Sequence, residues 1–207
     1  MRTRRWHTPV ALVVAAGVCV AAGVLIGWFG RGEPETGATP ILADADIVFA
    51  QQMSAHHQQA ITMVDMLGSG ATPDVRAVAE QIRASQWREI GTLTGWLELT
   101  GMPVQQPGAP DSSGDHHGHA AGMPGMASNE ELTRLYHATG DERDVLFLQL
   151  MIRHHQGGVA MAAAAAEVTA VPAVRARAIS IVNGQQQEIT LMTVSLDKRG
   201  GSALPYP

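Results

Sequence analysis

Cysteine, aromatic residues and positive charge are all scarce in this sequence. The one cysteine, Cys19, lies in an apolar run near the N-terminus, which excludes an intrachain disulfide and leaves no thiolate metal site in the rest of the chain. Aromatic residues make up only 4% of the chain whereas Ala, Gly, Val and Met are plentiful, which favours closely packed helices over a β-sheet. A net charge of -5 without a Lys/Arg-rich face argues against binding to nucleic acid. Methionine and histidine are then the strong ligands that remain for a soft metal ion.

A segment with two adjacent histidines occurs twice, at residues 49–63 and again 98 residues later at 147–161. At helical pitch, each copy places a phenylalanine, two methionines and the first histidine on one stripe. These residues are Phe49, Met53, His56 and Met63 in the first copy, and Phe147, Met151, His154 and Met161 in the second. The second histidine, His57 or His155, lies about 100° round the helix and borders the stripe. We expect one ring of each pair to face the core and the other to face a neighbouring helix or solvent.

Four long helical patterns follow the N-terminal region, at residues 43–67, 72–100, 141–168 and 172–198, with a short one at 128–138. The second and fourth patterns repeat each other at an offset of 99 residues. Both carry polar residues on an otherwise apolar stripe: Gln86, Glu89, Gln185 and Glu188. Because polar groups are costly to bury alone, we expect Glu89 and Glu188 to accept hydrogen bonds from imidazole N–H groups or to bind a metal directly.

Two helix hairpins related in this way predict an all-α fold, a four-helix bundle over residues 43–198 with a long crossover at 102–127. The site would then lie inside the bundle. Residues 199–207 are expected to form a loose tail.

The N-terminal region predicts a membrane anchor. Arg2, Arg4 and Arg5 precede an uncharged run of 22 residues from Pro9 to Gly30, which is long enough for a transmembrane helix. Because positive charge stays on the cytoplasmic side, residues 1–31 would form a basic cytoplasmic tip and a single-pass anchor in the cell membrane. The bundle would then be extracytoplasmic, or periplasmic, behind a linker at residues 32–42. Cleavage of a signal peptide, giving a secreted protein, is the alternative.

The crossover is rich in Gly, Pro, His and Met and lacks helical periodicity. Tracts of this composition bind metals. We therefore expect an auxiliary site for capture and hand-over of ions, formed by His116, His117, His119, Met123 and Met126. The alternative is a solvated linker whose histidines bind nothing.

The repeated segments resemble the bacterial domain of unknown function 305 family. The resemblance covers residues 44–198 and is carried by Phe49-x3-Met53-x2-His56-His57, Phe147-x3-Met151-x2-His154-His155, Gln86-x2-Glu89 and Gln185-x2-Glu188. It implies a ferritin-like fold and a kinship with CopM-like periplasmic copper-binding proteins. It also implies binding of Cu(I) or Ag(I) by Met and His, with a part in copper tolerance or delivery. This chain departs from a regular repeat at Gly157-Gly158, which replace Gln59-Ala60, open space beside His154 and make the two halves inequivalent.

Thioether and imidazole together favour Cu(I), with Ag(I) as its mimic, whereas zinc would leave the methionines idle. Copper affinity should then fall below about pH 6, since a protonated imidazole cannot bind a metal. The methionines have an alternative role as core packing. Copper sequestration or delivery, to an accepting protein or within a homodimer, is the function that we expect.

We expect no enzyme activity, because no serine, cysteine or lysine recurs with the histidines as a nucleophile. A di-iron oxidase is disfavoured because the Glu-x-x-His spacing is absent from the sequence. The alternative to metal binding is a structural or partner subunit of a membrane complex, in which a His-Glu network only organises the core.

Overall fold

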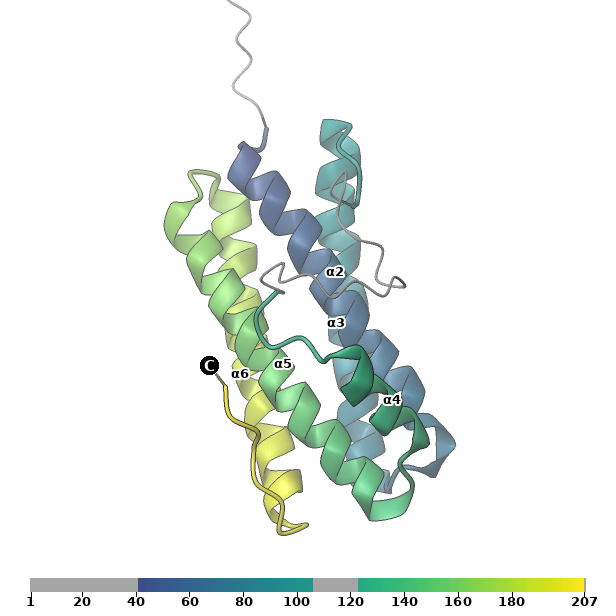
Figure 1. Cartoon of the computed structure of the whole chain (residues 1–207). Coiled ribbons are helices and arrows are strands. Elements are labelled where there is room, and N and C mark those ends of the chain that lie inside the picture. Colours follow the sequence, from purple (N-terminus) through teal and green to yellow (C-terminus); the bar gives the residue numbers. More distant parts are fainter. Residues whose placement is uncertain (1–40, 106–122, 207) are drawn as a thin grey trace, which may run out of the picture. The chain divides into compact units, whose positions relative to one another are not determined.

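The structure, a computed structural model, describes residues 41–105 and 123–206. This part of the chain is all-helical, with five α-helices, one short 3-10 helix and no β-strand (Figure 1). The elements are α2 (Asp44–Leu67), η1 (Gly68–Gly70), α3 (Pro73–Thr100), α4 (Asn129–His137), α5 (Gly140–Val168) and α6 (Pro172–Asp197). The helices begin and end within one or two residues of the bounds expected from the sequence, which is the ordinary uncertainty of a helix end.

Local sequence signals explain where these helices begin. Pro73 and Pro172 occupy the first turn of α3 and α6, where a missing backbone N–H costs nothing. Ser128 caps α4 by accepting a hydrogen bond from the backbone N–H of Glu131 at 3.1 Å. The Glu131 carboxylate accepts one from the backbone N–H of Ser128 at 2.9 Å in return, which completes a capping box.

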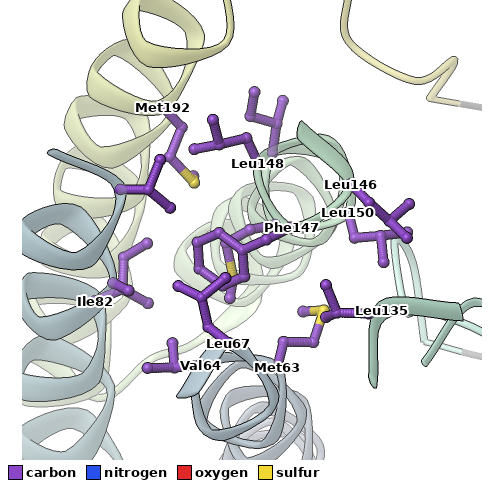
Figure 2. Close-up of a cluster of buried hydrophobic side chains, with 14 of the residues drawn as sticks. Met63, Val64, Leu67, Ile82, Leu135, Leu146, Phe147, Leu148, Leu150 and Met192 are labelled. Carbon is purple, nitrogen blue, oxygen red and sulfur yellow. The ribbon is translucent and has the colours of Figure 1, made fainter. Parts of the chain in front are cut away.

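The four long helices pack side by side, α2 against α3 and α5, and α6 against α5 and α3. Short α4 packs against α2 and α5. Apolar side chains of all four long helices form two buried clusters. The first contains Met63, Ile82, Phe147 and Met192 (Figure 2), and the second contains Met53, Leu93, Ala162 and Ile181.

A polar layer separates the two clusters along every long helix. His56 and His57 follow the second cluster and precede the first along α2, and His154 and His155 lie between the same two clusters along α5. Gln86, Glu89, Gln185 and Glu188 occupy the equivalent level of α3 and α6. The sequence repeat therefore brings its polar residues to one level in the middle of the helices, which is where a site can form.

The C-terminal tail is packed rather than loose up to Tyr206, which corrects the expectation from the sequence. The Gln149 side-chain amide donates a hydrogen bond to the Ser202 carbonyl at 2.7 Å, and Leu204 packs against the first cluster. These two contacts, at Ser202 and Leu204, attach the tail to the bundle, and no local sequence signal indicates them.

The predicted membrane span at residues 9–30 lies outside the described residues. Among the helices of residues 41–105 and 123–206, none combines the length and the apolar character that crossing a membrane requires.

Candidate metal centre

The first histidine of each pair lies where α2 packs against α5. His56 and His154 are both fully buried, and their rings stack with 3.8 Å between centroids and 30° between planes. The sequence stripe predicted that these two rings face the core, and the structure brings them into direct contact. Two buried imidazoles this close favour the neutral form of both, because two imidazolium ions would repel each other.

The second histidine of each pair is held by a glutamate from the neighbouring helix. His57 Nε2 lies 2.6 Å from the Glu89 carboxylate on α3, and His155 Nε2 lies 2.8 Å from the Glu188 carboxylate on α6. This is one of the two arrangements that the sequence left open for the glutamates. The rings of His57 and His155 are as fully buried as those of the first histidines, so neither reaches solvent as the stripe had allowed.

Every one of the four Nε2 atoms faces an acceptor. His56 Nε2 lies 3.0 Å from the Pro124 carbonyl, and His154 Nε2 lies 3.1 Å from the His56 carbonyl. Carbonyl and carboxylate oxygens can only accept, so each Nε2 carries the proton and donates. Each neutral ring therefore keeps a lone pair on Nδ1.

All four Nδ1 atoms are buried and lack a hydrogen-bond partner within the described part of the chain. The side-chain amides of Gln86 and Gln185, at the same level, are also buried without a partner. An unpaired buried acceptor costs about 1–3 kcal/mol, and buried polar groups are rarely left in this state. His57 and His155, each with Nε2 on a carboxylate and Nδ1 unpaired, have the arrangement that metal-binding histidines adopt.

A short strap formed by residues 123–127 makes the two halves inequivalent. The Gln59 side chain joins α2 to this strap through two hydrogen bonds with the Ala127 backbone, both 2.8 Å long. On α5, Gly157 takes the place of Gln59, and a side chain there would collide with the Pro124 carbonyl. The space that the sequence predicted beside His154 is therefore filled, at Gly157 by the strap and at Gly158 by the Gln185 amide.

The strap gives a prediction for Gly157. Gly157→Ala should destabilise the fold by about 1–3 kcal/mol, because a methyl group must displace the backbone of the strap. Gly91, an exposed helical glycine with open space around it, is the matched control, and Gly91→Ala should stabilise by about 0.5–1 kcal/mol. Urea unfolding of both variants measures the difference. Equal effects of the two substitutions would show that the strap does not press on Gly157.

Burial dominates the ionisation of the inner histidines. Removal from water, reinforced by the nearby His57, lowers the pKa of His56 to about 3, although the hydrogen bond to Pro124 opposes the shift. Burial also lowers the pKa of His154 well below its ordinary value, with the neighbouring His56 as the next cause. Burial acts to raise the pKa of Glu188, but its hydrogen bonds with His155 and Ser85 outweigh this and the pKa is lowered. At neutral pH the inner rings of His56 and His154 are therefore neutral, and Glu188 is ionised.

The methionines predicted as ligands are distributed over both apolar clusters. Met63 and Met151 are fully buried in the first cluster, to which Leu135 and Phe147 also belong (Figure 2). Met53 is fully buried in the second cluster, and Met161 packs against it while partly exposed. Packing thus accounts for the positions of all four, which lie in the clusters on either side of the polar layer.

The structure describes only part of the crossover. Met123 and Met126 belong to the strap and are partly buried, whereas His116, His117 and His119 lie outside the described residues. Three contributors to the site went unrecognised in the sequence: Pro124, Gln59 and Ser85. Pro124 acts through its backbone carbonyl, which no side-chain pattern can indicate. Ser85 donates a hydrogen bond to Glu188 at 2.7 Å, and its position one residue before Gln86 was the available signal.

A family model described as "Domain of unknown function (DUF305)" matches residues 46–196. A protein of Streptomyces coelicolor, provisionally named a secreted DUF305 protein, has a similar structure at 35% identity and a TM-score of 0.69, over 78% of this chain and 98% of that one. A DUF305 fragment from Deinococcus radiodurans is similar at 33% identity and a TM-score of 0.65, over 76% and 98% of the two chains.

CopM is similar as well, in two copper-bound forms. Its Cu(I)-bound form matches at 27% identity and a TM-score of 0.60, over 75% of this chain and 98% of that one. Its Cu(II)-bound form matches at 31% identity and a TM-score of 0.60, over 74% and 96%. Among curated proteins, none matches the sequence.

Proposed function

This chain belongs to the DUF305 family, and from that premise we propose that it binds copper at its paired histidines, outside the cytoplasm. The relative CopM has been solved with Cu(I) and with Cu(II), which supports copper as the ion. The observation that carries the proposal is the set of four buried Nδ1 lone pairs without partners, at His56, His57, His154 and His155.

The chemistry of the donors favours Cu(I). The soluble part of the chain has no cysteine, so neutral imidazole nitrogen and thioether sulfur are its soft donors. Met53 and Met151 each lie one helical turn before the first histidine of their copy and are fully buried. Ag(I), with the same preferences, is expected to compete for the site.

Binding requires a rearrangement of side chains. Within residues 41–105 and 123–206, no three His, Cys, Asp or Glu side chains form a group that could hold a metal ion. The rings of His56 and His154 are stacked, and the lone pair of each Nδ1 lies in the plane of its own ring. We therefore expect a ring to turn when copper binds, and methionine sulfur to complete the coordination.

Replacement of His57 and His155 by glutamine tests the proposal. Glutamine can keep a donor where Nε2 bonds the glutamate, but it has no lone pair at the position of Nδ1. The double variant should lose Cu(I) affinity by roughly a hundredfold or more, since two of the four proposed ligand nitrogens are gone. Anaerobic titration of the full chain against a Cu(I) chelator measures the tight component, separately from weak binding by the crossover histidines.

His137→Gln is the matched control, because His137 is exposed on α4 away from the polar layer. It should leave the affinity unchanged. Equal affinity in the wild type and the double variant would assign the paired histidines to structure. That outcome would favour the alternative function, a partner subunit of a membrane complex, which the two His–Glu hydrogen bonds also support.

The packing of the helices and the secreted relative support further parts of the proposal. The four long helices, packed in two hairpins, support a ferritin-like four-helix bundle. The secreted relative supports a location outside the cytoplasm, reached through residues 1–31 as an anchor or a cleaved signal. Sequestration or delivery of the ion, without enzyme activity, is the role that we propose. The crossover histidines His116, His117 and His119 would capture ions for the buried site, and a copper-accepting protein or a second copy of the chain would be the partner.

A further inference from the structure

The buried histidines need a route to solvent, and one face of the polar layer is closed. On the α2–α5 side, the strap covers this level: the Pro124 carbonyl accepts from His56 at 3.0 Å, and the strap backbone fills the space above Gly157. An ion that entered on this side would have to displace the strap and break its two hydrogen bonds with Gln59.

The opposite face opens into a groove between α3 and α6, with a volume of about 470 Å³. Glu89 and Glu188 both line this groove, and each also holds a buried histidine by a hydrogen bond. The two carboxylates are thus in contact with solvent on one side and with imidazole on the other. They form the polar connection from the surface to His57 and His155.

The charged side chains of the groove would let a cation pass through rather than hold it there. Arg88 and Arg177 line it together with the two glutamates, so the formal charges of these four side chains cancel. A cation is then not concentrated in the groove, and the buried lone pairs beyond it provide the stronger attraction.

The two glutamates differ in how firmly they are held. The Glu188 side chain is 6% exposed and accepts hydrogen bonds from both His155, at 2.8 Å, and Ser85, at 2.7 Å. The Glu89 side chain is 13% exposed, and His57 is its hydrogen-bond partner within the described residues. The difference follows from the repeat, because the offset of 99 residues that relates Glu89 to Glu188 places Gly184 where Ser85 stands in the other half. Gly184 lines the groove and offers no hydroxyl.

From these contacts we infer that copper enters and leaves through the α3–α6 groove, and that Glu89 is the movable gate. The carboxylate of Glu89 swings away from His57 and admits the ion, whereas Ser85 keeps Glu188 fixed on His155. This inference rests on the proposed function and assigns different roles to two carboxylates that the sequence repeat makes equivalent.

Gly184→Ser tests the gate by restoring the missing hydroxyl. A Cβ at Gly184 meets no atom within 4 Å, so the substitution fits without displacing a neighbour. A hydroxyl bonded to Glu89 should hold the gate closed and slow Cu(I) uptake about tenfold or more, the size of effect expected from one hydrogen bond to a charged group. The equilibrium affinity should change by less than about threefold, because the hydroxyl lies outside the ligand set. Gly184→Ala is the matched control, since it adds the Cβ without the hydroxyl.

Stopped-flow transfer of Cu(I) from a coloured chelator to the full chain gives the uptake rate, and the end point gives the affinity. A second pair of variants tests the gate without depending on whether the hydroxyl of the new serine points toward Glu89. Glu89→Gln should accelerate uptake by weakening the bond to His57, whereas Glu188→Gln should change the rate less, because Ser85 also holds that side chain.

If the wild type binds copper and all four variants load at its rate, the gate is refuted while the copper site stands. Slower loading in both Gly184 variants would assign the effect to bulk in the groove and would also overturn the role of Glu89. If the wild type takes up no copper, the proposed function is wrong, and so is the proposal that Glu89 is a gate.

Discussion

Acidification from pH 7 to pH 5 should destabilise the fold by about 2 kcal/mol through His56 alone, and by more once His154 is included. Burial lowers the pKa of His56 from 6.5 to about 3 and lowers the pKa of His154 well below 6.5. In the unfolded chain both rings bind a proton below pH 6.5, whereas in the folded chain they stay neutral. The unfolded state thus binds more protons, and the stabilisation present above pH 6.5 falls by about 1.4 kcal/mol per histidine for each pH unit below it.

Urea unfolding at pH 7, 6 and 5 measures this slope. Carboxylates with lowered pKa values, such as Glu131 and Glu188, change the free energy of unfolding only near and below their ordinary pKa of 4.5. The change between pH 6.5 and pH 5 is therefore due to the histidines. His56→Gln, which can still donate to the Pro124 carbonyl, should flatten the slope. A wild-type free energy of unfolding that is constant from pH 7 to pH 5 would contradict the neutral buried pair.

The same burial changes the pH dependence expected of copper binding. The sequence alone predicts that affinity falls below about pH 6, the range where an ordinary histidine takes up a proton. With the pKa of His56 at about 3, a proton competes weakly with copper for that ring at pH 5. The loss of folded protein, rather than competition at the ligand, is then expected to limit copper binding as the pH falls.

Arg199→Ala should destabilise the fold by about 1.5–3 kcal/mol, because it removes charge-assisted hydrogen bonds to Asp74 and the cation beside the buried Asp144. The Arg199 guanidinium follows the C-terminus of α6 and donates to both carboxylate oxygens of Asp74, at 2.7 and 2.9 Å, in the first turn of α3. It also lies 3.7 Å from Asp144, which is buried in the first turn of α5. Its hydrogen bonds hold the pKa of Asp74 below the usual range. The Arg199 side chain thus joins the ends of α3, α5 and α6, and in this way it links the two hairpins.

Arg83→Ala is the matched control, because Arg83 pairs with Asp65, whose side chain is 60% exposed. An exposed pair contributes about 0–1 kcal/mol, so this variant should remain close to the wild type. Thermal or urea unfolding of both variants gives the comparison. If the two arginine variants lose the same small free energy, the junction of helix ends does not stabilise the fold beyond an ordinary surface pair.

Much of the fold follows from local signals in the sequence. Pro73, Pro172 and the Ser128–Glu131 capping box act within one helical turn, so the positions of the helix starts could be read before any packing was known. The repeat, at an offset of 98 or 99 residues, likewise placed the paired histidines and the two glutamates on facing stripes. Family membership follows from the same residues, because it depends on their identity and spacing.

Tertiary packing decided what sequence periodicity leaves open. The depth of His57 and His155, the stacking of His56 on His154 and the burial of four Nδ1 atoms depend on how the helices approach one another. The inequivalence of the halves also arises from packing, since the Pro124 carbonyl reaches His56 across 68 residues of chain and Ser85 reaches Glu188 across 103. The sequence by itself determined which residues share a helix face, because that face is set by a period of about 3.6 residues. Only the tertiary structure decided which atoms of those residues find partners, because hydrogen bonds between distant segments depend on distances that no local period contains.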